Sequence, residues 1–196
     1  MPSPPIVWGK ILNFLERPWV LWAGCLWGLA EATLFFVVPD VLLTFVALYS
    51  PRRTPKLVAS ILLGSLAGGS LMFYMGARNP RQAEAMVLRV PFVSPAMIEK
   101  THHGFERDGL WTLAKAPGNG IPYKVYCVQA SRYANWGAFI AMSVLARLER
   151  FAPFWIAAAA LGTIFRTRIH RRPAFPAAMH VVLWILGYAW YWSRIG

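Results

Sequence analysis

The chain has 196 residues, of which 57% are hydrophobic and 14% charged, against roughly 25% charged in an average soluble domain. This length fits a single domain, and ten tryptophans among so many apolar residues favour a membrane protein over a soluble core. The net charge of +12 is concentrated between apolar runs, as at Arg52, Arg53 and Lys56. Basic residues placed this way are typical of contact with membrane lipids and their anionic headgroups, and they do not form the basic, aromatic-interleaved face that binds nucleic acid.

The first eighteen residues predict a helix at the membrane surface. After Pro2, Pro4 and Pro5, apolar residues recur at helix-like spacing through Leu15. A short amphipathic helix of this kind lies in the bilayer interface, so residues 1–18 are expected to form an interfacial helix.

Residues 19–50 predict a broken, re-entrant hairpin. The apolar run 19–38 contains Glu31 as its only charge, Pro39-Asp40 interrupts it, and ten more mostly apolar residues follow. The whole stretch is too long for one span and too short for two, since each needs about 20 residues. Irregular backbone at membrane depth is tolerated only where protein or a wet cavity surrounds it, so this hairpin predicts surrounding helices.

Residues 57–77 are expected to form a transmembrane span, and 78–108 an extramembrane segment. Ser60, Gly64 and Gly68 recur at four-residue intervals along the span, a small-residue stripe that lets another helix approach closely. In the polar segment, Ser94-Pro95 and Gly109 have the spacing of the two ends of an amphipathic helix.

Residues 109–146 repeat the broken pattern. Two prolines and two glycines interrupt the apolar residues at Pro117, Gly118, Gly120 and Pro122. A continuous helix cannot pass through them, which predicts a second hairpin. Residues 151–165 then predict a short span, 166–172 a basic loop, and 174–192 a last span that ends in an aromatic belt.

The basic clusters predict the orientation. If residues 19–50 enter and return on one side, Arg17 shares a face with the cluster at Arg52, and the loop 166–172 returns to it, as the positive-inside rule requires. The second hairpin then enters from the opposite face. We therefore expect an all-α, polytopic helical bundle in the cell membrane, with two opposed re-entrant hairpins in an inverted-repeat-like arrangement.

Four ionisable residues are the candidate substrate or proton site: Glu31, Asp40, Lys115 and Lys124. A charge at the bilayer centre costs about 2.5 to 3.5 kcal/mol on insertion scales, so each needs a reason to be there. If the hairpin tips meet, the acids and bases would neutralise each other as a purely structural cluster, or would bind an anionic headgroup or a proton. The amides of the 117–122 loop, with Asn119, would contact phosphate oxygens.

Other polar residues give weaker signals. Arg132 is either a snorkelling residue or a headgroup contact. His102 and His103 are adjacent instead of at helical ligand spacing, and the two cysteines do not form a CxxC pair, so neither a metal site nor a cofactor is expected. His180, in the last span, is expected to make a helix–helix hydrogen bond. No enzyme motif occurs, and we predict that the protein is not an enzyme.

The ordered set of these residues resembles the DedA family, the bacterial branch of the VTT-domain (SNARE-associated) membrane proteins. Glu31 followed by Pro39-Asp40-Val41-Leu42-Leu43 is similar to the family's acidic E…PG[DE]xLL signature, and Gly64, Gly68 and the stretch Tyr74-Met75-Gly76-Ala77-Arg78 to its G…G…YxxGR stretch. The segment 105–109, Phe-Glu-Arg-Asp-Gly, resembles its FxxxG lead-in. The chain departs from the pattern where Val38 and Pro39 precede the acid and where lysines stand in place of arginines.

This resemblance implies a bacterial inner-membrane protein that flips or scrambles phospholipids or the undecaprenyl phosphate carrier, with proton coupling left open. It implies that Glu31 and Asp40 form the acidic pair, and that Lys115 and Lys124 stand approximately in place of the family's basic pair.

The expected function is therefore a lipid or lipid-phosphate translocase. Two alternatives remain open from the residues: a non-transporting membrane scaffold or assembly factor that binds partners through 78–108, and a small-solute or ion transporter that uses the same charges. Homo-oligomerisation is also left open.

Overall fold

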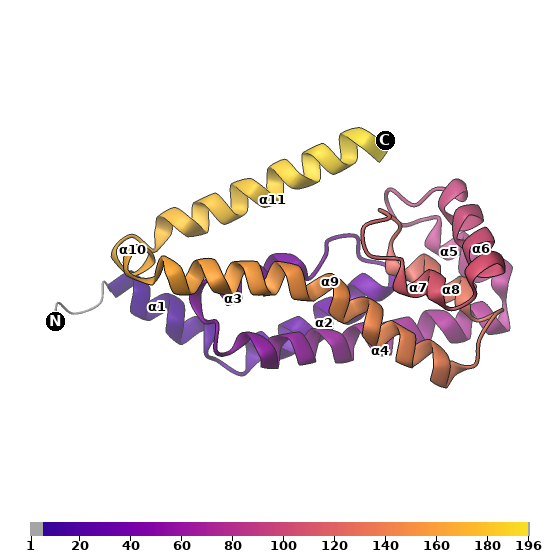
Figure 1. Ribbon diagram of the computed structural model, residues 1–196, viewed down its shortest axis with the longest axis horizontal. Helices are drawn as coiled ribbons and strands as arrows, with labels where there is room; N and C mark the ends of the chain where they lie inside the picture. The colour runs from indigo at the N-terminus through magenta and orange to yellow at the C-terminus, as the bar shows by residue number, and fades with distance from the viewer. Residues whose placement is uncertain (1–5, 196) are drawn as a thin grey trace.

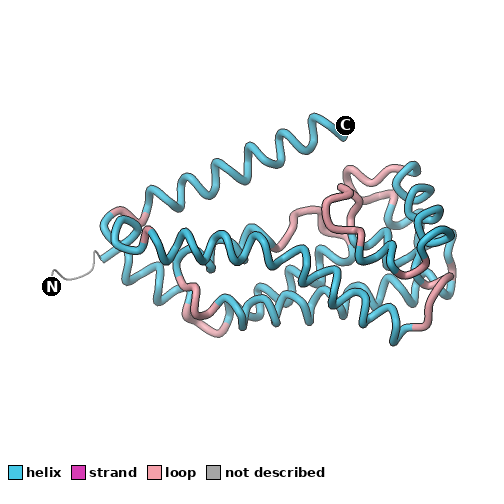
Figure 2. The backbone as a smooth tube through the Cα atoms, in the orientation of Figure 1, coloured by secondary structure: helices cyan, strands magenta, loops and turns pink. Residues whose placement is uncertain are grey.

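The computed structural model describes residues 6–195, and within them every regular secondary-structure element is a helix. The helices of this part are α1 (Ile6–Leu15), α2 (Trp19–Thr33), α3 (Asp40–Tyr49), α4 (Thr54–Arg78), α5 (Pro80–Val87), α6 (Pro95–Asp108), α7 (Trp111–Ala114), α8 (Tyr123–Ala130), α9 (Trp136–Ile164), α10 (Arg166–Arg171) and α11 (Ala174–Ile195). Figure 2 shows them joined by short loops, without a strand between residues 6 and 195.

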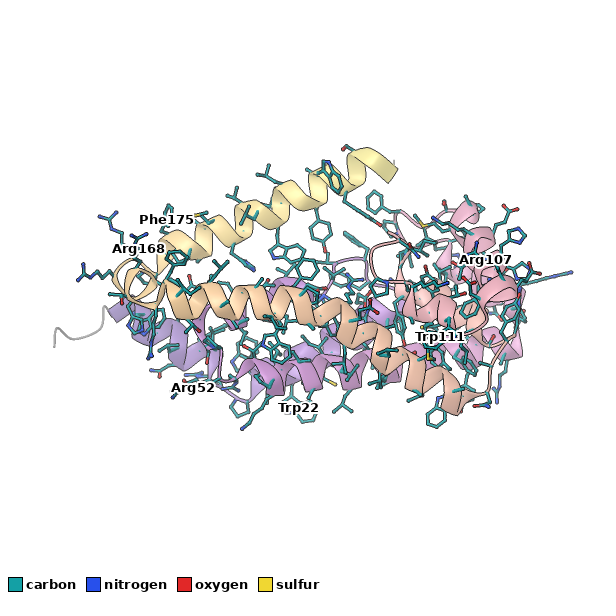
Figure 3. The ribbon with its side chains drawn as sticks, viewed as in Figure 1. Trp22, Arg52, Arg107, Trp111, Arg168 and Phe175 are labelled. Atoms are coloured by element: carbon teal, nitrogen blue, oxygen red, sulfur yellow. The ribbon has the colours of Figure 1, made fainter. Side chains whose placement is uncertain are left out.

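The bundle is elongated, with different kinds of structure at its two ends. Helices α2, α3, α4 and α9 run along the long axis, α5 to α8 gather at one end, and α11 lies along one side (Figure 1). At the other end α1 meets α10, where the rings of Trp8 and His170 are 3.8 Å apart. We call this the basic end, because Arg52 and Arg168 both lie there, whereas Arg107 and Trp111 lie at the opposite end (Figure 3).

Within residues 6–195, two helices are long and apolar enough to cross a membrane, α4 and, from Ala174 to Tyr191, α11. They contain the expected spans 57–77 and 174–192. Helix α11 exposes large apolar side chains such as Val182, Leu183 and Leu186. An apolar surface of this extent is stable in contact with lipid and unfavourable in water.

The first broken segment has the expected break. Helix α2 ends at Thr33, residues 34–39 are irregular, and α3 begins at Asp40 directly after Pro39. Proline disfavours helical backbone in the residue before it, which explains why the helix cannot run through. The indole N–H of Trp27 donates to the Val37 carbonyl at 2.9 Å and closes the loop. The two arms then separate, α2 packing on α4 and α3 on α9.

The small-residue stripe brings α2 and α4 into close contact, as predicted. A Cβ added at Gly64 would lie 1.8 Å from the Cys25 carbonyl oxygen, and one at Gly68 would lie 2.6 Å from that of Leu29. The Ser60 hydroxyl donates to the Leu21 carbonyl at 2.5 Å. The α2 and α4 backbones can approach this closely only because no side chains stand between them.

The second half differs from the predicted boundaries. The expected elements 109–146 and 151–165 are replaced by short α7 and α8 and by a long α9 that runs from Trp136 to Ile164 through Pro153. The break predicted at Pro117 to Pro122 is present between α7 and α8, and a further break lies at residues 131–135, where the Asn135 side chain accepts a hydrogen bond from the Ala138 N–H at 2.9 Å and caps α9. An asparagine cap at the helix start outweighs the apolar run, and one internal proline bends or weakens a helix without having to end it.

The polar segment 78–108 contains α5 and α6. As predicted, α6 starts at Pro95 after Ser94 and is followed by Gly109, whose φ of 58° lies in the left-handed region. The stretch 166–172, expected to be a loop, forms the short helix α10 up to Arg171.

Candidate functional site

The centre of the site is a buried ion pair between Glu31 and Arg147. Glu31 lies in the last turns of α2, just before the first break, and is 3% exposed, while Arg147 comes from α9 and is 2% exposed. The guanidinium also donates to the Ser65 hydroxyl on α4 at 2.8 Å. Its Cζ lies 4.6 Å from the ring centroid of Tyr123 on α8. The first hairpin, α4, α8 and α9 therefore meet around one arginine.

Asp40, at the start of α3, is only partly neutralised. Its Oδ2 lies 3.4 Å from a guanidinium nitrogen of Arg150, whose side chain is 28% exposed. Its Oδ1 is buried and has no hydrogen-bond partner among the described residues. A buried carboxylate oxygen without a donor is unfavourable, and it is suited to receive a proton, a cation or a polar substrate group.

Lys124 joins the second break to the first. It lies in the first turn of α8, is buried, and donates from Nζ to the Phe35 carbonyl at 2.9 Å. Helix α11 covers the same junction, because Tyr188 accepts from the Val38 N–H at 2.8 Å and Tyr191 donates to the Gly120 carbonyl at 2.7 Å. The loops at both breaks therefore lie together under the end of α11.

Lys115 lies outside this cluster. Its Nζ is 2.8 Å from Asp108 Oδ2, and its side chain is 60% exposed. Hydrogen bonds from Arg107 and then from Lys115 lower the pKa of Asp108 to about 2. The short α7 ends at Ala114, which leaves Lys115 beside the polar segment instead of the acidic pair.

The remaining residues of the second break shape the loop. Gly118 and Gly120 have φ values of 89° and 72°, which favour glycine, and Pro122 precedes α8. The side chain of Asn119 donates to the Lys115 carbonyl at 2.8 Å, and Pro117 lies between these residues, partly buried. The glycines let the chain reverse so that Lys124 points back to the first break.

Arg132 has a protein partner. It forms an ion pair with Glu84 of α5 at 2.8 Å, and the Gln129 side chain donates to the same carboxylate at 2.8 Å. This network connects α5 to the end of α8, and it lies in the half-exposed polar region of the molecule.

The basic partners of the two acids, Arg147 and Arg150, are not among the candidate residues that the sequence suggests. The sequence predicts that residues 147–150 separate the second hairpin, 109–146, from the span 151–165, which would put Arg147 and Arg150 at the membrane face. In the structure both arginines lie within α9, three residues apart, and so reach the first hairpin together. The usable signal was the continuous apolar spacing on both sides of Arg147, which suits one long helix with one polar stripe.

His180 makes the expected helix–helix contact. Its Nε2 lies 2.9 Å from the Thr44 hydroxyl, and the Trp184 indole N–H lies 3.2 Å from the same oxygen. These contacts hold α11 against α3.

The composition of the cluster decides which ligands it could take. Glu31 and Asp40 face Lys124, Arg147 and Arg150. Two carboxylates against three bases leave one positive charge in excess if all are ionised, which suits an anionic group such as a phosphate. Comparison of the chain with family models, with curated proteins and with solved structures found no match.

Proposed function

We propose that this chain is a multi-pass membrane protein that translocates phospholipids or lipid phosphates, whose headgroups pass the cluster around Glu31 and Arg147. The observation that carries the proposal is a set of buried ionisable side chains where two broken segments meet. Ionisable groups inside a membrane are functional by default. Most buried polar atoms in folded proteins have a hydrogen-bond partner, so the unpartnered Asp40 Oδ1 supports a role in binding.

The proposal includes two re-entrant segments of opposite orientation, in a bacterial inner membrane. The α2–α3 hairpin would enter from the basic end, which the positive-inside rule assigns to the cytoplasm, and the segment 109–130 from the other face. The hydrogen bond from Lys124 to Phe35 supports the meeting of the two tips. We further propose that the chain is a divergent member of the DedA family, since Glu31 and Asp40 fall at the family's acidic positions.

The test is transbilayer exchange of a fluorescent phospholipid in vesicles that contain the full-length protein. Wild-type protein should accelerate exchange over protein-free vesicles, and Asp40→Asn should slow it by roughly tenfold, the effect of about 1.4 kcal/mol. The matched control is Glu149→Gln, which removes the same charge from an exposed position on α9 and should exchange lipid as wild type does. A wild-type protein that accelerates exchange of no anionic lipid would reject the proposal.

Proton or small-cation transport is the second candidate, and the unpartnered Asp40 oxygen favours it. In the same vesicles this activity would appear as a proton or cation flux without lipid movement. Loss of that flux in Asp40→Asn, with exchange absent in every sample, would decide for the second candidate.

A further inference from the structure

A groove beside α11 is separate from the charged cluster. Helix α11 rises away from α9 along its length (Figure 1), and its first half encloses a cavity of about 720 Å³ with α3, α9 and α10. The walls are mainly apolar, with Ala158 and Leu161 on one side and Phe175, Met179 and Leu183 on the other. This volume lies within the roughly 300 to 1,000 Å³ of typical small-molecule sites.

Three arginines line the groove at the basic end: Arg168, Arg171 and Arg172. The Cζ of Arg168 lies 5.8 Å from the ring centroid of Phe165, so this guanidinium lies over the aromatic ring. In the described part of the chain, no carboxylate forms an ion pair with any of the three. Unpaired guanidinium groups at the mouth of an apolar groove match a phosphate attached to a hydrocarbon chain.

Hydrogen bonds along α11 fix its position beside the groove. At its base the Tyr49 hydroxyl donates to the Pro173 carbonyl at 2.6 Å, and half-way along His180 contacts Thr44 at 2.9 Å. Near its far end Tyr188 contacts Val38 at 2.8 Å. These contacts fix α11 to α3 and to the first break, while the groove lies on the side of α11 that faces α9 and α10.

Helix α11 also borders the first break. A second cavity of about 400 Å³ shares His180 with the first and extends to Val37 and Tyr188, beside the first break. His180 contacts Thr44 at 2.9 Å where it lines both cavities, so α11 touches α3 at this point.

We propose that this groove binds one anionic phospholipid from the leaflet at the basic end, with its phosphate on Arg168, Arg171 and Arg172 and an acyl chain between α9 and α11. The exposed apolar side chains of α11 place the opening of the groove toward bilayer lipid. The inference rests on the proposed function for the membrane location, and it adds a lateral lipid site at the basic end of the bundle.

The test uses full-length protein in phosphatidylcholine vesicles and a phosphatidylglycerol that carries a photoactivatable group on its acyl chain. Crosslinks should map to α9 around Leu161 and to α11 around Met179. Unlabelled phosphatidylglycerol should compete, whereas phosphatidylcholine and glycerol 3-phosphate should not. In the double variant Arg171→Gln/Arg172→Gln, the concentration of unlabelled phosphatidylglycerol needed to compete should rise roughly tenfold or more, as expected for the loss of two cationic contacts.

The matched control is Arg52→Gln/Lys56→Gln, which removes two exposed charges at the same end but outside the groove, and should change competition by less than about twofold. Ala158→Phe should fill the groove and reduce crosslinking while leaving the thermal melting of the protein unchanged. Equal losses in the two double variants, or equal competition by phosphatidylcholine, would overturn the site. Competition by glycerol 3-phosphate would show that the ligand is not a phospholipid and that the arginines bind a free phosphate group.

Binding and transport are separable in this design. Asp40→Asn should slow lipid exchange and keep crosslinking, because Asp40 does not line the groove. If wild-type protein crosslinks phosphatidylglycerol but exchanges no lipid, the proposed function fails and the binding site stands. If it exchanges lipid but the crosslinks lie elsewhere, the site fails and the function stands.

Discussion

The two broken segments look alike in sequence and are built differently. Each has a proline-containing break flanked by two ionisable residues, Glu31 and Asp40 in the first, Lys115 and Lys124 in the second. The first keeps both charges buried, and each has an arginine partner from α9. In the second segment only Lys124 is buried, while Lys115 is exposed and pairs with Asp108. A charge beside a break is therefore buried where a distant part of the chain supplies its partner, α9 for the two acids and the first loop for Lys124.

The largest effect should come from removing the arginine that serves the first segment. Arg147→Met leaves Glu31 buried without its partner, and the free energy of unfolding should fall by about 3 to 5 kcal/mol. Arg150→Met, which removes a longer and partly exposed pair, should destabilise the protein clearly less. Unfolding by sodium dodecyl sulfate in mixed micelles measures the stability of both variants. Similar losses of stability would contradict the view that the Glu31–Arg147 pair matters more than the Asp40–Arg150 pair.

The next effect concerns how the first segment is positioned. Gly64→Ala puts a methyl group against the Cys25 carbonyl and should destabilise the protein by about 1 to 3 kcal/mol through forced separation of α2 and α4. Gly187→Ala on α11, where nothing lies within 4 Å of the added carbon, should be neutral or slightly stabilising. Equal melting temperatures for the two variants would contradict the close α2–α4 contact.

Within the second segment the two lysines should behave unequally. Lys124→Met removes the donor to the Phe35 carbonyl inside the protein and should lower stability by about 1 to 3 kcal/mol. Lys115→Met changes an exposed side chain and should alter stability far less. A larger loss in Lys115→Met would mean that the wrong lysine has been assigned to the junction.

The smallest effect is a pH dependence at the surface. The pKa of Asp108 is lowered to about 2 from an ordinary 3.8, so its pairing stabilises the fold above the ordinary value and is lost as the pH falls through the lowered one. The melting-temperature difference between wild type and Lys115→Gln should therefore be constant from about pH 5 to pH 8 and shrink toward pH 2. A difference that changes between pH 5 and pH 8 would contradict the Asp108 pairing.

Local signals predicted much of this fold. Proline breaks, the glycine stripe and the Ser94 to Gly109 spacing each depend on neighbouring residues, and the structure has the break at Pro39, the close α2–α4 packing and α6 in the predicted places. The composition likewise predicted an all-helical chain, and α4 and α11 are long and apolar enough to cross a membrane.

The sequence did not reveal which charges pair. Arg147 is 116 residues from Glu31, and its burial depends on α9 continuing through Pro153. Because the boundary expected at 147–150 is wrong, Arg147 was expected at the membrane face, whereas it lies in the site. For the same reason, Arg147 and Arg150 were not recognised as the partners of the two acids. Lys115 was expected in the position that these α9 arginines occupy.

The pairing of Glu31 with Arg147 across the junction is tested most directly by a double-mutant cycle with Glu31→Leu, Arg147→Met and the double variant. The coupling free energy should be about 2 kcal/mol or more, and the double variant should recover much of the stability that each single variant loses. Additive losses, with a coupling near zero, would show that the two side chains do not meet.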